Sequence, residues 1–224
     1  MTLQIDSLDQ QLFLILNGIH TTYFDWVMWN VSSRLSWLII MLTFLWTLHD
    51  KGWLGAVVAV FAIALTVAIA DQVSAGFIKG FFERLRPTHE PSLSGMVHTV
   101  NSYVGGNYGF VSSHAANSFG VAIIASLIMK NRTVFWAMTA WAILQSFSRI
   151  YLGVHYPGDV LGGLVLGLVA ALAVYGLVKL ANHYWPKAVP VEKFTSDDGR
   201  LMVCSLVVTV VIIAAISPFW LLKL

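Results

Sequence analysis

The chain of 224 residues is 58% hydrophobic and 11% charged, and its mean hydropathy is +0.75. That hydropathy exceeds what a soluble domain needs to build a core, and it indicates a protein embedded in a lipid bilayer. The net charge of +2 is small and the basic residues are dispersed, which argues against nucleic-acid binding. The single cysteine, Cys204, excludes an internal disulfide.

The predicted elements begin with a short amphipathic stretch at residues 7–19, which we expect to be a helix lying in the membrane interface. The apolar stretches that follow are each about 20 residues long, the length that crosses roughly 30 Å of hydrocarbon. They cover residues 26–48, 53–78, 114–130, 133–151, 158–182 and 201–222, and polar residues such as Asn30 and Arg34 interrupt the first. The sequence therefore predicts an all-α fold, a polytopic membrane helix bundle of about six transmembrane helices plus the interfacial helix, in one domain over residues 1–224.

Most of the charge near the membrane lies in three short stretches. They are KGFFERLRP (Lys79–Pro87), VSSHAANS (Val111–Ser118) and SRIYLGVHYPGD (Ser148–Asp159). With the predicted helices in place, an even number of membrane crossings separates any two of these stretches. All three therefore fall on one side of the membrane. Charges at this depth are costly, which suggests that they converge on a shared ligand.

The residue types in these stretches suit a phosphate group. Lys79, Arg86 and Arg149 are cations without nearby acceptors, and an arginine fork matches phosphate oxygens. Ser112 and Ser113 open a predicted helix, whose first unpaired amides form an anion site.

Two histidines add proton-transfer and nucleophilic chemistry near neutral pH. His155 lies four residues before Asp159, and a carboxylate there can orient the imidazole so that its other nitrogen attacks. We expect no dedicated metal cage and no cofactor, because Asp159 is the one carboxylate close in the sequence to either His114 or His155 in these stretches.

At these residues the chain resembles the type 2 phosphatidic acid phosphatase (PAP2) family of membrane lipid phosphatases, which shares its core with vanadium haloperoxidases. The family pattern is Lys-x6-Arg-Pro, then Pro-Ser-Gly-His, then Ser-Arg-x5-His-x3-Asp. The first and third motifs are complete here, and the second has Val111 in place of Pro and Ser113 in place of Gly. The motifs span residues 79–159, which we take as the catalytic core.

The resemblance implies a role for each matching residue. His155 would be the nucleophile that forms a phosphohistidine, Asp159 would orient it, and His114 would protonate the leaving oxygen and help activate water. The phosphate would be held by Lys79, Arg86, Ser112, Ser113 and Arg149.

Several residues outside these motifs have simpler expectations. Arg84 resembles an interfacial arginine that extends to lipid headgroups. His89 and His98 lie in the long loop of the site, where either of them could contact the substrate or have a structural role. Asp71 falls within a predicted span, where it can pair with a neighbouring helix. The glycines at 162, 163 and 167 favour close helix packing.

The basic residues bear on orientation, because cytoplasmic loops carry an excess of Lys and Arg. The site side holds Arg34, Lys79, Arg84, Arg86, Arg149 and Lys223, and the opposite side holds Lys51, Lys130, Arg132, Lys179, Lys187, Lys193 and Arg200. Four of the first group belong to the motif stretches and report poorly on topology. Without these four residues, the side opposite the site has the excess of Lys and Arg and is expected to be cytoplasmic. The site is therefore predicted on the periplasmic face of a bacterial inner membrane, with both termini on that side.

The expected function is hydrolysis of a lipid phosphomonoester or diphosphate, with undecaprenyl diphosphate as the favoured substrate. A lipid A phosphatase and a phosphatidylglycerophosphatase are alternatives within the family, and an anion-binding transporter is an alternative of another class. Transporter sites tend to lie near the bilayer midplane, whereas these motifs lie at helix ends. The expected partners are the lipid phosphate and membrane lipids, with no obligate protein partner.

Overall fold

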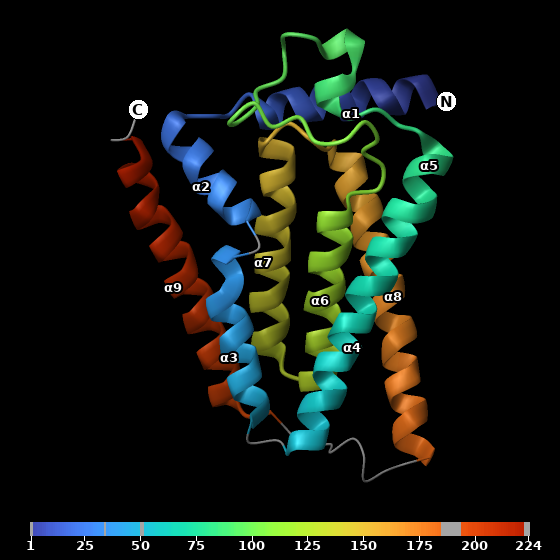
Figure 1. Ribbon diagram of the computed structural model, residues 1–224, viewed down its shortest axis with the longest axis vertical. Helices are drawn as coiled ribbons and strands as arrows, with labels where there is room; N and C mark the ends of the chain where they lie inside the picture. Colours follow the sequence, from blue (N-terminus) through green and yellow to red (C-terminus); the bar gives the residue numbers. More distant parts are fainter. Residues whose placement is uncertain (1, 34, 50–51, 185–193, 222–224) are drawn as a thin grey trace.

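The computed structural model describes residues 2–33, 35–49, 52–184 and 194–221, and in this part of the chain the fold is helical without β-strands. The long helices run side by side as a bundle, and one helix lies across its end (Figure 1). The all-α membrane bundle predicted from the sequence is therefore confirmed. Five residues that entered the orientation count lie outside the described residues: Arg34, Lys51, Lys187, Lys193 and Lys223.

The helix across the end of the bundle is α1 (Thr2–Asn17), which covers the stretch expected to lie in the interface. Its last residue, the buried Asn17, holds it in place. The Asn17 side chain donates to the carbonyls of Tyr151 and His98 at 2.8 and 3.1 Å, and accepts from the His98 amide at 2.8 Å. One amide side chain thus joins α1 to a loop and to a bundle helix.

The stretch expected as one helix at 26–48 is broken. The helix α2 (Thr22–Ser32) ends at Ser33, whose backbone is extended, and the chain resumes as η1 (Leu35–Trp37) and α3 (Leu38–His49). The two parts meet at 74°. Small hydroxyl residues at 32–33 offer the backbone alternative hydrogen bonds and favour such an end, and the indole of Trp37 closes the corner by donating to the Val31 carbonyl at 2.7 Å.

Three helices among the described residues are long and apolar enough to cross a membrane: Trp53–Phe82, Pro157–Tyr184 and Ser196–Ser217. The first combines α4 (Trp53–Gln72), a π-helical segment η2 (Val73–Ile78) and α5 (Lys79–Phe82). The other two belong to α8 (Pro157–Tyr184) and α9 (Ser196–Leu221). The bent pair of α2 and α3 makes a fourth if it is counted as one span.

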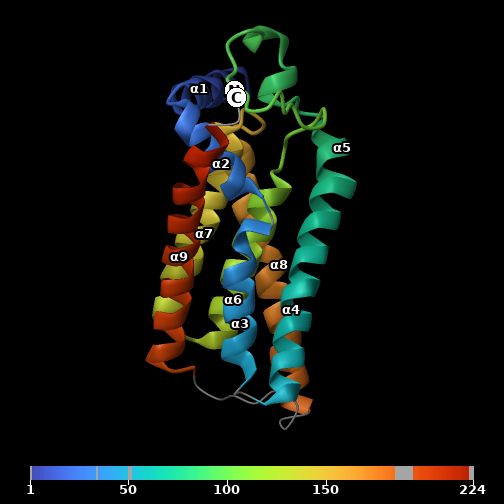
Figure 2. The same cartoon turned by 60° about the vertical axis from the view of Figure 1, so that its left-hand side comes forward.

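Two further helices, α6 (Ser113–Met129) and α7 (Arg132–Tyr151), run beside these through the bundle (Figures 1 and 2). Glycines of α8 let it approach α6 closely, as the sequence suggested. A Cβ atom on Gly163 would lie 2.6 Å from the Ser112 carbonyl oxygen, which is closer than real Cβ atoms come. Close backbone contact is how membrane helices gain packing energy, because lipid gives them little hydrophobic drive to associate.

The long loop between α5 and α6 covers the same end of the bundle as α1 (Figure 2). It contains two short 3-10 turns, η3 (Pro87–His89) and η4 (Pro91–Leu93). The end of α9 lies at this end too, so both ends of the described chain lie at the same end of the bundle (Figure 1).

Candidate active site

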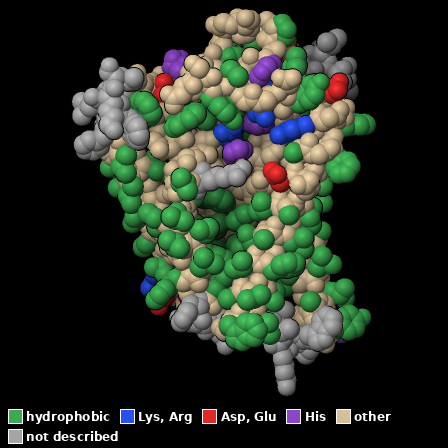
Figure 3. Space-filling view, in the orientation of Figure 1, with side chains coloured by type: hydrophobic (Ala, Val, Ile, Leu, Met, Phe, Trp, Pro, Cys, Tyr) green, Lys and Arg blue, Asp and Glu red, His purple; other side chains and the backbone are tan. Residues whose placement is uncertain are grey.

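The three polar stretches of the sequence meet at this end of the bundle. Figure 3 shows Lys, Arg and His side chains gathered around a hollow there, above a mainly hydrophobic surface. A backbone hydrogen bond from the Ser112 amide to the Asp159 carbonyl, 2.9 Å long, ties the start of α6 to the first turn of α8. The second and third motifs are therefore joined directly, through main-chain atoms.

His155 and Asp159 form the centre of the cluster. Both are buried, at 1% and 0% exposure, and Nδ1 of His155 lies 3.3 Å from Oδ2 of Asp159. The same carboxylate oxygen accepts the Tyr156 amide at 3.0 Å. The turn at residues 155–156 and the first turn of α8 bring the Asp159 carboxylate to the imidazole of His155, four residues earlier in the chain.

The other imidazole nitrogen faces Arg86. Nη1 of Arg86 lies 3.0 Å from Nε2 of His155 and also donates to the Val154 carbonyl at 3.0 Å. A guanidinium has only donors, so Nε2 must be the accepting, unprotonated nitrogen and Nδ1 must carry the proton toward Asp159. This tautomer leaves the Nε2 lone pair directed at the cationic side of the site.

The charges around His155 keep it neutral. Burial lowers the pKa of His155 well below its ordinary value, and the nearby Arg86, Arg149 and Lys79 cations lower that pKa further. Burial likewise lowers the pKa of Arg86, with Arg149 contributing. The Nε atoms of Arg86 and Arg149 are buried donors without a partner among the described residues. Crowded cations with unused donors are suited to an anion.

The start of α6 supplies the hydroxyl side of the cluster. Ser112 caps the helix by accepting the Ala115 amide at 3.4 Å, and His114 follows in the first turn. Ser113, which stands where the family has glycine, accepts a hydrogen bond from the Lys79 ammonium at 2.9 Å and lies 2.8 Å from the Ser74 hydroxyl. The larger residue is thus accommodated between Lys79 and the π-helical segment.

Arg149 is held by two residues that the sequence did not single out. Its Nη2 donates to the Tyr103 hydroxyl at 3.0 Å, and its Nη1 donates to the hydroxyl of Ser32. Ser32 is available because α2 ends there, and Tyr103 comes from the long loop. The break in the expected first span therefore has a direct connection to the site.

Arg84 was expected to extend to headgroups, and that expectation is wrong. Its guanidinium pairs with Asp159 at 2.9 Å and with Asp9 of α1 at 2.7 Å, and it stacks over the Tyr156 ring at 4.3 Å. Neither partner is within 70 positions of it in the chain, so no local pattern could have revealed these contacts.

The other residues noted in the sequence have clear places. His98 pairs with Asp25 at 2.8 Å and stacks on His20 with ring centroids 3.7 Å apart, which makes it a structural contact between the loop and the α1–α2 connection. Asp71 accepts from the Asn117 side chain at 3.3 Å, the helix pairing expected for it.

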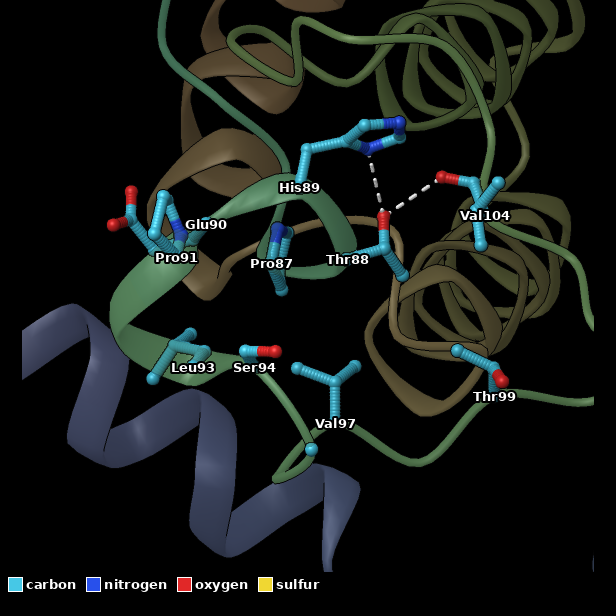
Figure 4. Close-up of a pocket in the computed structure, with 11 residues that line it drawn as sticks. Pro87, Thr88, His89, Glu90, Pro91, Leu93, Ser94, Val97, Thr99 and Val104 are labelled. Atoms are coloured by element: carbon cyan, nitrogen blue, oxygen red, sulfur yellow. Dashed lines mark hydrogen bonds between the residues drawn. The ribbon is translucent and has the colours of Figure 1, made fainter.

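His89 lines a cavity of about 220 Å³ formed by residues 87–104 of the loop (Figure 4). The Thr88 hydroxyl lies 3.1 Å from Nδ1 of His89 and donates to the Val104 carbonyl at 2.8 Å, and Glu90 adds a carboxylate to the wall. Pro87, another wall residue, directly follows Arg86 in the chain.

The described residues contain no group of three or more His, Cys, Asp or Glu side chains arranged to hold a metal ion. The arrangement they do contain is an oriented, neutral imidazole beside three cations and a helix start. Chemically it can bind a phosphate and present a nitrogen nucleophile to it.

Comparison with known proteins finds relatives over most of this chain. Residues 54–183 match the model of the PAP2 superfamily. A lipid A 4'-phosphatase of Porphyromonas gingivalis is 35% identical over 90% of this chain and 87% of its own, and one of Bacteroides thetaiotaomicron is 38% identical over 73% of each chain.

A solved structure shares the fold. The transmembrane PAP2 type phosphatidylglycerolphosphate phosphatase from Bacillus subtilis superposes with a TM-score of 0.59 at 22% identity, over 79% of this chain and 87% of its own.

Proposed function

Because the chain belongs to the PAP2 superfamily and is an integral membrane lipid phosphatase, we propose that it removes a phosphate from a lipid A-type glycolipid through a phosphohistidine at His155. The observation that carries the chemistry is the His155–Asp159 pair, whose tautomer directs Nε2 toward the cationic cluster. The catalytic core is the region from residue 79 to residue 159.

The mechanism uses the residues in the roles that the geometry allows. Nε2 of His155 attacks the phosphorus, the bond to the lipid oxygen breaks, and His114 donates a proton to that oxygen. Asp159 stabilises the imidazolium character that develops on the ring. A water molecule then attacks the phosphohistidine, His114 takes its proton, and phosphate and neutral His155 are released.

The cations stabilise the transferring group. Arg86 moves from Nε2 to the phosphate oxygens, and Lys79, Arg149 and the helix start at Ser112 complete the cradle, with Ser113 holding Lys79. Phosphoryl transfer depends mainly on positioning and on neutralising charge at the equatorial oxygens, and this set supplies both. No cofactor takes part in these steps.

The substrate assignment moves from undecaprenyl diphosphate, favoured in the sequence, to lipid A. Two relatives with that activity in their names support it. The loop cavity of residues 87–104 supports it as well, because its wall begins at the residue after Arg86 and offers hydroxyl, imidazole and carboxylate groups that suit a sugar. Undecaprenyl diphosphate remains the competing substrate, since the same nucleophile can attack a terminal phosphate of a diphosphate.

We also propose that the site faces the periplasm from a bacterial inner membrane. Lys130, Arg132, Lys179 and Arg200 lie on helix segments at the opposite end of the bundle, whose loops would be cytoplasmic by the positive-inside tendency (Figure 1).

The test is phosphate release by the purified protein from lipid A, undecaprenyl diphosphate, phosphatidylglycerol phosphate and phosphatidic acid, compared side by side. We expect the highest kcat/KM with lipid A, and a loss of about 10³-fold or more for His155→Ala. His183→Ala, an exposed histidine near the end of α8 away from the site, is the matched control and should keep full activity. Equal release by wild type and His155→Ala would overturn the chemistry, and preference for undecaprenyl diphosphate would overturn only the substrate.

A further inference from the structure

Arg84 bridges two carboxylates from distant parts of the chain. Its Nη1 donates to Oδ1 of Asp159 at 2.9 Å, and its Nη2 donates to Oδ2 of Asp9 at 2.7 Å. The Arg84 and Asp9 side chains are 23% and 11% exposed, and that of Asp159 is fully buried. Partial burial makes this pair of contacts stronger than an ion pair on an open surface.

The contact with Asp159 complements the one made by the histidine. Oδ2 of Asp159 faces His155 and the Tyr156 amide, and Oδ1 faces Arg84. A carboxylate held at both oxygens cannot rotate, so the oxygen under the imidazole stays in register with Nδ1. Arg84 also offsets part of the cost of burying the Asp159 carboxylate, which would help that carboxylate to stabilise an imidazolium.

Asp9 extends the same network to α1. Its Oδ1 accepts the amide of Gly158 at 2.8 Å, in the first turn of α8, while its Oδ2 binds Arg84. The approach is close: a Cβ atom on Gly158 would lie 2.6 Å from Oδ2 of Asp9. Position 158 therefore admits the Asp9 carboxylate because it is glycine.

We propose that Arg84 and Asp9 are positioning residues for the His155–Asp159 pair, so that the amphipathic helix α1 is a working part of the active site. Neither residue touches the transferring phosphate. Arg84 acts through Asp159, and Asp9 acts through Arg84 and the start of α8. This inference rests on the proposed function, because Arg84 and Asp9 can position the nucleophile only if His155 is the attacking group.

The experiment measures kcat and KM with a short-chain phosphatidic acid in detergent, together with the melting temperature of each purified variant. For Arg84→Gln we expect kcat to fall about 10- to 100-fold with KM changed less than about twofold, since a misaligned catalytic group costs rate and leaves phosphate binding intact. Arg84→Lys keeps the charge but cannot span two carboxylates, so its kcat should lie between those of wild type and Arg84→Gln.

Variants at the α1 end separate positioning from folding. Asp9→Asn keeps an acceptor for Gly158 but loses the ion pair, and Gly158→Ala forces the Asp9 carboxylate away without changing charge. Both should lower kcat several-fold. The matched control is the exposed Arg200–Asp197 pair, 3.1 Å apart on α9 at the opposite end of the bundle, and Arg200→Gln should match wild type.

The outcomes are distinct. A fall in kcat for Arg84→Gln and Asp9→Asn, with KM retained and partial recovery by Arg84→Lys, supports the inference. Wild-type kcat in Arg84→Gln, or losses that follow the melting temperature alone in all four variants, overturns it. An active His155→Ala would defeat the proposed function itself, whereas an inactive His155→Ala beside a fully active Arg84→Gln would defeat this inference alone.

Discussion

Nη1 of Arg86 lies 3.0 Å from Nε2 of His155, so the guanidinium occupies the direction from which a phosphate would approach the proposed nucleophile. The Val154 carbonyl holds the same Nη1 at 3.0 Å. In the proposed mechanism, phosphate oxygens would compete for this donor, and the Nε2 lone pair would become free as Arg86 turned toward them. The proposed mechanism would thus couple substrate binding to release of the nucleophile through the Arg86 side chain.

Replacing Arg86 tests that coupling. Arg86→Lys keeps a positive charge but loses the fork that can serve phosphate and carbonyl together, and we expect kcat/KM to fall about 10²-fold. Arg86→Gln, which also loses the charge, should fall about 10³-fold. Steady-state phosphate release measures both, with the exposed Arg132→Gln on α7 as the control. A lysine variant as active as wild type would show that the fork is dispensable.

The pH dependence follows from the neutral state of His155. Burial and three cations lower the pKa of His155, so its lone pair persists as pH falls through the ordinary imidazole value near 6.5 and is lost only below it. We expect the acidic limb of kcat/KM to lie below pH 6.5. The rate profile between about pH 4 and 8 measures it. An acidic limb centred above 6.5 would contradict the neutral, cation-surrounded imidazole.

Ser113 offers a test of the departure from the family motif. Its hydroxyl accepts from Lys79 at 2.9 Å, and Ser113→Gly removes that partner while restoring the family residue. A neutral acceptor of this kind contributes about 1 kcal/mol, so we expect KM to change about two- to tenfold with kcat nearly constant. Ser126→Gly, on α6 away from the site, is a control for the helix cost of glycine. A large loss of kcat would mean that Ser113 contacts the transferring group.

The α6–α8 contact can be tested with two alanines in one helix. Gly163→Ala places a methyl group 2.6 Å from the Ser112 carbonyl, whereas a Cβ on Gly176 meets nothing within 4 Å. We expect Gly163→Ala to lower the melting temperature and the activity together, because the start of α6 carries the phosphate cradle. Gly176→Ala should be neutral or slightly stabilising, by up to about 1 kcal/mol. Equal melting temperatures and activities in the two variants would contradict the conclusion that Gly163 is needed for close packing of α8 against α6.

The parts that sequence reasoning predicted were those with local spacing. His155 lies four residues before Asp159, across the turn that begins α8, and Lys79 precedes Arg86 by seven positions, so the members of each pair are close in the sequence. Helices were predicted because long apolar runs have few other structures open to them in lipid. Polar residues such as Asn30 indicated that the stretch at 26–48 is interrupted. The 74° angle between its two parts depends on packing against other helices, which those residues alone do not determine.

The parts that were missed depend on contacts between distant segments. Arg84 meets Asp9 across 75 positions, and Arg149 meets Ser32 across 117. A single arginine in a loop carries the same local signal whether it reaches lipid or a buried carboxylate. Only the fold decides between the two, through the placement of α1 over the start of α8.

The cradle lies where α5 ends and where α6 and α8 begin, at one end of the apolar helices. A reactive group at that level can be reached by a headgroup while the acyl chains stay among their neighbours in the leaflet. Drawing a lipid out would cost about 0.8 kcal/mol for each methylene exposed to water, a penalty that grows with every carbon. We expect catalysis at the helix ends to avoid this extraction, so that turnover depends little on acyl-chain length and the polar part of the lipid decides which substrate is selected.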